Sequence, residues 1–168
     1  ITASAAGIAA SGITAATTSG TATGASTFSH ISQSSTSGNG SGATFHVSTN
    51  GADAYSLNSI GSRGSGYQIG DTITISGSNL GGSDVVNDLT LTITALSPKS
   101  YIVSQSSTTG SGSGAIFNIS SNSSGNYAVT DITTFGENYA LNDIVTIAGS
   151  NIGGTDTQND ATLTLTSV

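Results

Sequence analysis

Two loops of the chain carry oxygen-bearing side chains close together in the sequence. They contain Asp84, Asn87 and Asp88 in the first loop and Asp156, Asn159 and Asp160 in the second. Carboxylate and amide oxygens in a loop are the ligands that Ca²⁺ prefers, so these six residues are candidate calcium ligands. Their spacing matches no EF-hand or nonapeptide calcium repeat, and the alternative is that they cap turns before the strand that follows. We expect no other cofactor.

Few side chains could carry out catalysis. A Ser-His-Asp arrangement would need His30 or His46, and neither lies in the strand-to-helix turn of a nucleophile elbow. The Gly-rich segments 38–42 and 110–114 resemble phosphate cradles, but no lysine follows them and no helix opens after them. We therefore interpret both segments as hairpin loops and expect no enzymatic activity. Three Asn-x-Ser sequons are candidate glycosylation sites, and they begin at Asn39, Asn118 and Asn122.

The composition excludes several classes of protein. Charged residues make up 7% of the chain and the net charge is -7, with Arg63 and Lys99 as the two basic residues. A surface that neutralises phosphates needs many such cations, so we expect no nucleic-acid partner. The absence of cysteine excludes disulfides, and no apolar run approaches the roughly 18 residues needed to span a bilayer. A hydrophobic content of 35% is too high for a disordered chain, so a folded protein is predicted.

An internal repeat organises the sequence. Residues 25–96 align without a gap with residues 97–168, and 32 of the 72 aligned positions are identical. The motif Gly-x-Gly-Tyr-x-x-Gly-Asp at 64–71 recurs at 136–143 with Asn138 and Asn142 in place of two glycines. Glycine and asparagine tolerate positive φ, so the motif predicts tight turns whose aspartate accepts hydrogen bonds from turn amides.

Alternating apolar and polar residues predict strands in both copies. The first copy alternates at 43–47, 71–75 and 89–93, the second copy does so at the corresponding segments, and weaker strands are expected near 31–35 and 55–60. The predicted fold class is all-β, with two tandem homologous small β-sandwich or barrel-like repeats of 72 residues. Because each repeat has few large apolar side chains, we expect stacking on a neighbour or self-association to stabilise it.

Residues 1–24 lie outside both copies and form a separate N-terminal arm in this division of the chain. Their large apolar side chains are Ile1, Ile8 and Ile13, and their glycines weaken a helix. An extended arm of this kind fits insertion into a neighbouring subunit as an added strand, which makes the three isoleucines candidate assembly residues. The alternative is a flexible linker or the remnant of a preceding shaft. Because the chain begins at Ile1 rather than Met, we expect a processed mature chain or a fragment.

Three sequence patterns, in order, carry a resemblance to a known family. They are Ser-Gly-Ala-Thr-Phe-x-Val at 41–47, Gly-x-Gly-Tyr-x-x-Gly-Asp with its following strand at 64–77, and Leu-Gly-Gly at 80–82 followed by Asn-Asp-Leu-Thr-Leu-Thr at 87–92. They resemble repeats of tail-fibre-like and virion structural proteins of marine bacteriophages, especially those infecting cyanobacteria. The resemblance covers both copies but not residues 1–24. It implies a non-catalytic fibre or appendage module and carries no catalytic residues.

We therefore expect a structural subunit that self-assembles into an extracellular fibre or virion appendage, with copies of itself as partners. One alternative is a secreted pilus-like filament subunit joined by donor-strand exchange. Another is an adhesin or glycan-binding module that contacts glycans on a host surface. Because so few charges could contribute, assembly is expected to be insensitive to salt and pH.

Overall fold

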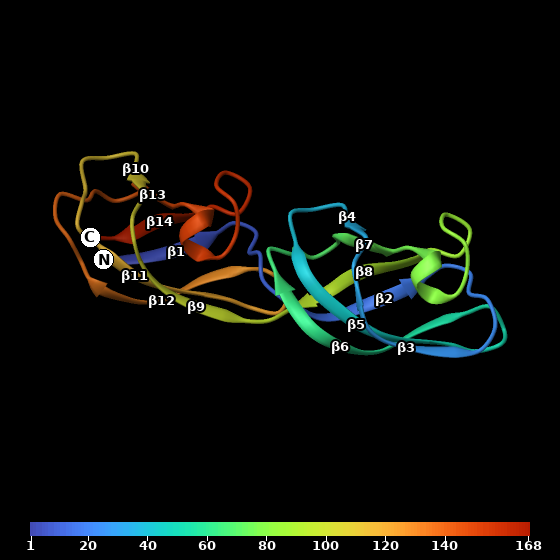
Figure 1. Ribbon diagram of the computed structural model, residues 1–168. Coiled ribbons are helices and arrows are strands. Elements are labelled where there is room, and N and C mark those ends of the chain that lie inside the picture. The colour runs from blue at the N-terminus through green and yellow to red at the C-terminus, as the bar shows by residue number, and fades with distance from the viewer. The chain divides into compact units, whose positions relative to one another are not determined.

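The computed structural model describes all 168 residues and contains fourteen β-strands, two short 3-10 helices and no α-helix. The chain divides into two compact units (Figure 1). The continuous unit is Gly12–Ser97, and the split unit combines Ile1–Ser11 with Pro98–Val168. Residues 1–24 are therefore divided between the two units, whereas the sequence suggested an arm separate from both repeats.

The continuous unit contains a four-stranded and a three-stranded antiparallel sheet. The first has the order β2-β8-β7-β4, and the second has the order β3-β5-β6. The strands are β2 (Ile13–Ser19), β3 (Ser26–Ser32), β4 (Ser35–Thr36), β5 (Ser41–Thr49), β6 (Tyr55–Ser65), β7 (Thr72–Ile75) and β8 (Leu89–Leu96), with the helix η1 (Gly77–Leu80) after β7.

The split unit has the same strand order in its two sheets. Its four-stranded sheet is β1-β14-β13-β10, and its three-stranded sheet is β12-β11-β9. The elements are β1 (Thr2–Ala6), β9 (Lys99–Ser104), β10 (Ser107–Thr108), β11 (Ile116–Ser121), β12 (Tyr127–Thr134), β13 (Ile144–Ile147), η2 (Gly149–Ile152) and β14 (Ala161–Ser167). The register is also shared, since Ile73 opposite Leu91 corresponds to Val145 opposite Leu163.

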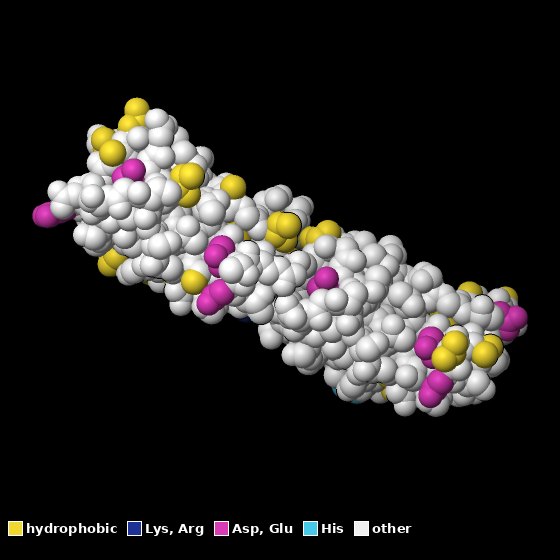
Figure 2. Space-filling view, turned by 90° about the horizontal axis from the view of Figure 1, so that it is seen from above, with side chains coloured by type: hydrophobic (Ala, Val, Ile, Leu, Met, Phe, Trp, Pro, Cys, Tyr) yellow, Lys and Arg dark blue, Asp and Glu magenta, His cyan; other side chains and the backbone are white.

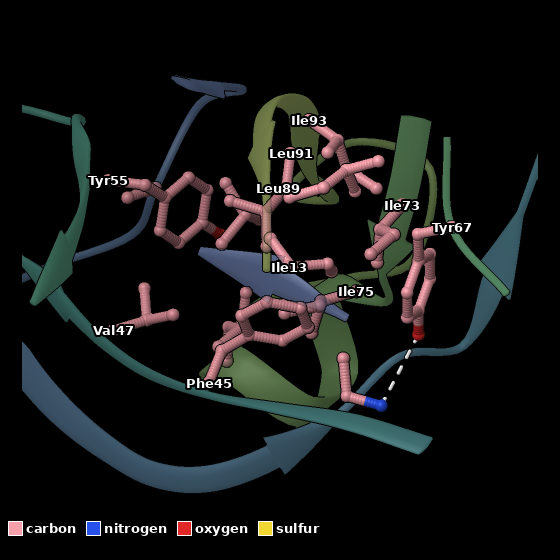
Figure 3. Close-up of a cluster of buried hydrophobic side chains, with 14 residues drawn as sticks. Ile13, Phe45, Val47, Tyr55, Tyr67, Ile73, Ile75, Leu89, Leu91 and Ile93 are labelled. Carbon is pink, nitrogen blue, oxygen red and sulfur yellow. Dashed lines mark hydrogen bonds between the residues drawn. The ribbon is translucent and has the colours of Figure 1, made fainter. Parts of the chain in front are cut away.

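The all-β prediction is confirmed. The alternation of apolar and polar residues determines which side chains of each strand are buried. In β5 the odd-numbered residues Phe45 and Val47 are fully buried, whereas the residues between them are half-buried. Ile73, Leu89 and Leu91 from the facing sheet pack into the same core (Figure 3). β3 begins at Ser26, earlier than the expected strand near 31–35.

The turn motif around Tyr67 folds as its residue types predict. Positive φ occurs at Gly64, Gly66 and Gly70 and also at Asn138 and Asn142 in the split unit, which confirms the prediction. The side chain of the following aspartate accepts a hydrogen bond from a turn amide in both units, at 2.9 Å in each.

Tyr67 links this turn to the core of the continuous unit. Its hydroxyl accepts a hydrogen bond from the Ala43 amide at 3.3 Å (Figure 3) and donates one to Gln33. Burial raises the pKa of the Tyr67 hydroxyl, which keeps it protonated as a donor at neutral pH. The ring is fully buried and covers Gly40, whose missing side chain leaves room for it.

Val85 is a strained residue at an exposed loop. Its φ is 70°, a conformation that costs a residue with a Cβ about 1–2 kcal/mol. Asparagine tolerates this region, so Val85→Asn is expected to raise the free energy of unfolding of the continuous unit by about 1 kcal/mol. Chemical denaturation followed by circular dichroism measures the change. Val86→Asn, next to it and without positive φ, is expected to change stability by less than about 0.5 kcal/mol; equal effects of the two substitutions would show that the backbone conformation of Val85 is not strained.

The surface is dominated by hydroxyl, amide and backbone groups. The face shown in Figure 2 is mostly white, with small separate clusters of hydrophobic and acidic side chains. None of the helices in the structure is long and apolar enough to cross a membrane.

Candidate functional site

The first residues of the chain supply an edge strand to each unit. β1 pairs with β14, with Ala3 opposite Leu165, and β2 pairs with β8, with Ala16 opposite Ile93. Each four-stranded sheet is thus completed by addition of an antiparallel strand. For β2 the rest of its sheet follows directly in the chain. For β1 the partner strand comes only after the whole continuous unit.

The three isoleucines named as assembly candidates have different positions. Ile13 is fully buried in the core of the continuous unit, and Ile1 packs partly buried against the core of the split unit. Ile8 is 57% exposed, although its backbone forms a bridge to Asn126. The structure therefore does not gather them on one surface. Ile1 and Ile13 instead fix β1 and β2 to their own units.

Asn87 and Asn159, two of the candidate calcium ligands, connect the loops to the arm. The Asn159 side chain is almost fully buried, donates to the Ile8 carbonyl at 2.9 Å and accepts from the Thr155 amide at 2.9 Å. Asn87 makes the equivalent bonds to the Thr21 carbonyl at 3.0 Å and the Ser83 amide at 2.9 Å. These bonds hold the segment that follows β1 or β2 against its unit.

Buried tyrosines reinforce the same two loops. The Tyr127 hydroxyl donates to the Asn159 carbonyl at 3.1 Å, and the Tyr55 hydroxyl donates to the Asn87 carbonyl. Burial, with a smaller contribution from the negative charge of Asp88, raises the pKa of Tyr55. The hydroxyl therefore remains a donor at neutral pH.

The four aspartates of these loops accept hydrogen bonds from backbone amides. The Asp88 carboxylate accepts from the Gly77 amide at 2.8 Å and the Val85 amide at 2.9 Å, and Asp84 accepts from the Ser78 amide at 2.8 Å. Asp156 and Asp160 make the equivalent bonds in the split unit. These are the contacts that the turn-capping alternative predicts. No group of three or more metal-ligating His, Cys, Asp or Glu side chains occurs in the structure.

Asp84 and Asp156 predict a loss of stability in acid. Hydrogen bonds from the hydroxyl and then the amide of Ser78 hold the pKa of Asp84 below its ordinary value of 3.8, and Ser150 does the same for Asp156. A lowered folded-state pKa gives stability that is present above the unfolded value and is lost as the pH falls through the folded value. At pH values below about 4, the denaturant concentration at which half of the protein is unfolded is therefore expected to decrease. Asp84→Asn with Asp156→Asn, which keeps an acceptor, is expected to flatten that part of the profile; an unchanged profile would exclude these carboxylates as its cause.

A groove runs beside each arm strand. In the split unit a groove of about 350 Å³ lies between β1 and β12, and its apolar lining includes Ile1, Ala3, Val129, Ile132 and Phe135. The continuous unit has a groove of about 400 Å³ between β2 and β6, lined by the equivalent strands. β1 and β12 are both edge strands of their sheets. Edge strands can pair with a further strand through main-chain hydrogen bonds.

The sequons lie in three different environments. Asn39 is exposed in the loop before β5, and Asn122 is exposed at a turn where its side-chain oxygen accepts from the amides of Ser124 and Asn126. Asn118 lies within β11, and its side-chain oxygen is buried without a partner. Only Asn39 and Asn122 therefore present exposed side chains in loops.

Two features of the site escaped the sequence interpretation. One is the placement of β1 and β2, for which a short signal exists, because Ile1-Thr2-Ala3 recurs as Ile13-Thr14-Ala15. The other is a contact between His30 and His46, which come from different strands. No spacing in the sequence indicates that contact.

Comparisons with protein-family models, curated proteins and solved structures find no match to this chain. The split unit has three features suited to strand pairing. They are open strand edges, a strand supplied from a distant part of the chain, and a side chain that holds the segment after this strand in place.

Proposed function

We propose that this protein is a non-catalytic structural subunit that self-assembles into an extracellular fibre or virion appendage, with copies joined by exchange of β1. The observation that carries the proposal is the pairing of β1 with β14. This pairing joins residues from opposite ends of the chain, as in the bond between Thr2 and Thr166, which are 164 positions apart.

Exchange of β1 between copies would use the contacts already present within one chain. Residues 98–168 form the split unit together with a β1 strand at the edge beside β14. The β1 of a second copy offers the same backbone bonds and the same small side chains, Ala3 and Ala5, to the same core. Exchange of an identical element between protomers is a low-cost route to association.

The continuous unit lacks this freedom. β2 is followed after a few residues by β3 and then by the rest of its own unit, so pairing within the chain is strongly favoured by proximity. β1 of each copy is thus suited to pairing with another copy, whereas β2 is suited to pairing within its own chain. A donor and an acceptor at different places on one subunit give a head-to-tail contact, which extends into a filament when it does not close into a ring.

The chemistry of the surface supports a structural role. The loop carboxylates that were candidate calcium ligands accept hydrogen bonds from their own turns. Strand pairing relies on backbone bonds and apolar contact, so it needs few charges. Increasing the salt concentration to about 1 M, where the Debye length is near 3 Å, is expected to leave the assembly intact.

Sedimentation velocity after refolding at increasing protein concentration tests the proposal. The natural chain is expected to form species of increasing mass, in low salt and in high salt alike. A variant lacking residues 1–11 keeps the continuous unit but has no β1 to donate, so it is expected to remain monomeric. A natural chain that stays monomeric at every concentration, or a truncated variant that still polymerises, would overturn the proposal.

A further inference from the structure

The two histidines of the chain meet on the outer face of a sheet in the continuous unit. His30 belongs to β3 and His46 to β5, and their ring centroids are 4.4 Å apart with an interplanar angle of 70°. The neighbours of His46 along β5, Phe45 and Val47, point into the core, so His46 points outward. Both imidazoles are at least partly accessible to solvent.

A β-bulge places His30 beside His46. Phe28 lies opposite Val47 and Ile31 opposite Phe45, so Ser29 and His30 together oppose one residue. His30 has a φ of 54°, which is uncommon for a residue other than glycine. Bulges of this kind redirect a side chain.

The split unit lacks this bulge. There Tyr101 lies opposite Ile119 and Val103 opposite Phe117, with the single residue Ile102 opposite Asn118. β3 therefore has one residue more than β9 over this stretch. Before Ile31, the ungapped alignment of the two copies pairs each residue with a position one residue away from its structural equivalent. The continuous unit thus has an additional residue at the point where His30 contacts His46.

The neighbouring strand also makes room for His46. A side chain at Gly61 in β6 would place its Cβ 3.0 Å from His46 Nε2, so the absence of one leaves space for the ring. The equivalent residues of the split unit are Asn118 and Thr133, a smaller side chain beside a larger one. The bulge, the glycine and the two imidazoles thus occur together in one unit and are all absent from the other.

We propose that His30 and His46 bind a divalent transition-metal ion of the Zn²⁺, Cu²⁺ and Ni²⁺ group. Imidazole nitrogen is a favoured ligand of these ions. A ligand bond of about 2.0–2.1 Å places the metal about 3.2 Å from the ring centroid, so two rings on one metal have centroids about 4.5–5 Å apart. The observed separation of 4.4 Å is close to this value, and metal binding requires the two rings to turn until one nitrogen of each is directed at the ion. Two ligands come from the protein and water completes the coordination.

This site is independent of the proposed assembly by β1. It lies in the continuous unit, whereas β1 completes the split unit. Its ligands are also distinct from the loop aspartates, whose oxygens accept backbone hydrogen bonds. A failure of metal binding would therefore leave the assembly proposal untouched, and the converse also holds.

Titration with Zn²⁺, followed by calorimetry and by the imidazole proton signals in nuclear magnetic resonance spectra, tests the site. The natural chain is expected to bind one Zn²⁺ and to shift the signals of both histidines. His46→Asn introduces the residue that the split unit has at this position, and His30→Ser removes the other ligand. Each substitution is expected to weaken binding by about tenfold or more, because one of two protein ligands is lost.

Two controls distinguish binding at the histidines from unfolding and from binding at the loop carboxylates. Unchanged amide spectra outside β3 and β5 show that the variants are folded. Asp84→Asn with Asp156→Asn is expected to leave Zn²⁺ binding unchanged. The proposal is overturned if the natural chain does not bind Zn²⁺ at millimolar concentration, if either histidine variant binds as tightly as the natural chain, or if the aspartate variant loses binding.

Discussion

Replacing Gly40 with alanine is expected to destabilise the continuous unit by about 3 kcal/mol. The added Cβ would lie 2.0 Å from Cδ1 of Tyr67, far closer than the 3.4–4 Å of an ordinary van der Waals contact. The Tyr67 ring cannot move aside easily, because it is fully buried and its hydroxyl is bonded to Gln33 and Ala43. Denaturant unfolding monitored by hydrogen exchange, which reports on each unit separately, measures the loss.

Two further glycines serve as controls for this substitution. Gly112→Ala creates the same contact with Tyr139, but that ring is only partly buried and can shift, so a smaller loss is expected in the split unit. A methyl group at Gly51 would have no heavy atom within 4 Å, and Gly51 has no positive φ, so Gly51→Ala is expected to be nearly neutral. Equal effects at Gly40 and Gly51 would show that contact with Tyr67 does not determine the cost.

Asn159→Ala is expected to destabilise the split unit by about 2 kcal/mol and to loosen β1. The substitution removes the donor to the Ile8 carbonyl and the acceptor for the Thr155 amide, and it leaves both groups without their partner. Hydrogen exchange is expected to accelerate in Thr2–Ala6 and in the facing strand Ala161–Ser167. If β1 is exchanged between copies, the variant should also exchange it faster.

Asn87→Ala is the matched control for this prediction. It breaks the equivalent bonds to Thr21 and Ser83, and it is expected to accelerate exchange in β2 and β8 while β1 stays protected. An Asn159 variant that accelerates exchange equally in both units, or in neither, would contradict the role assigned to this side chain.

Local chemistry made part of the fold predictable. The alternation in residues 43–47 and the Gly/Asn positions around Tyr67 determine strand faces and positive-φ turns from neighbouring residues alone. The sites of strand pairing depend on contacts distant in sequence. β1 consists of Thr, Ala and Ser, and apart from the short recurrence of Ile-Thr-Ala at 1–3 and 13–15 its residues do not indicate that its partner lies at Ala161–Ser167.

The candidate sites were predictable to different degrees. Aspartate and asparagine in a Gly-rich loop fit both a calcium site and a turn cap, and the amide hydrogen bonds around Asp84 and Asp88 are those expected of a turn cap. The contact of His30 with His46 depends on one additional residue in β3. An alignment of two copies of equal length conceals such a bulge.

Disulfide trapping tests exchange of β1 most directly. The natural chain contains no cysteine, and Ser4 lies opposite Thr164 in the register of β1 with β14. A chain with Ser4→Cys and Thr164→Cys, refolded at high concentration and oxidised, is expected to give a ladder of covalently linked oligomers on a non-reducing gel. Thr17→Cys with Thr92→Cys is the equivalent pair in the continuous unit, and it is expected to link only within one chain. Monomers alone from both pairs would show that β1 remains in its own chain and would contradict the account.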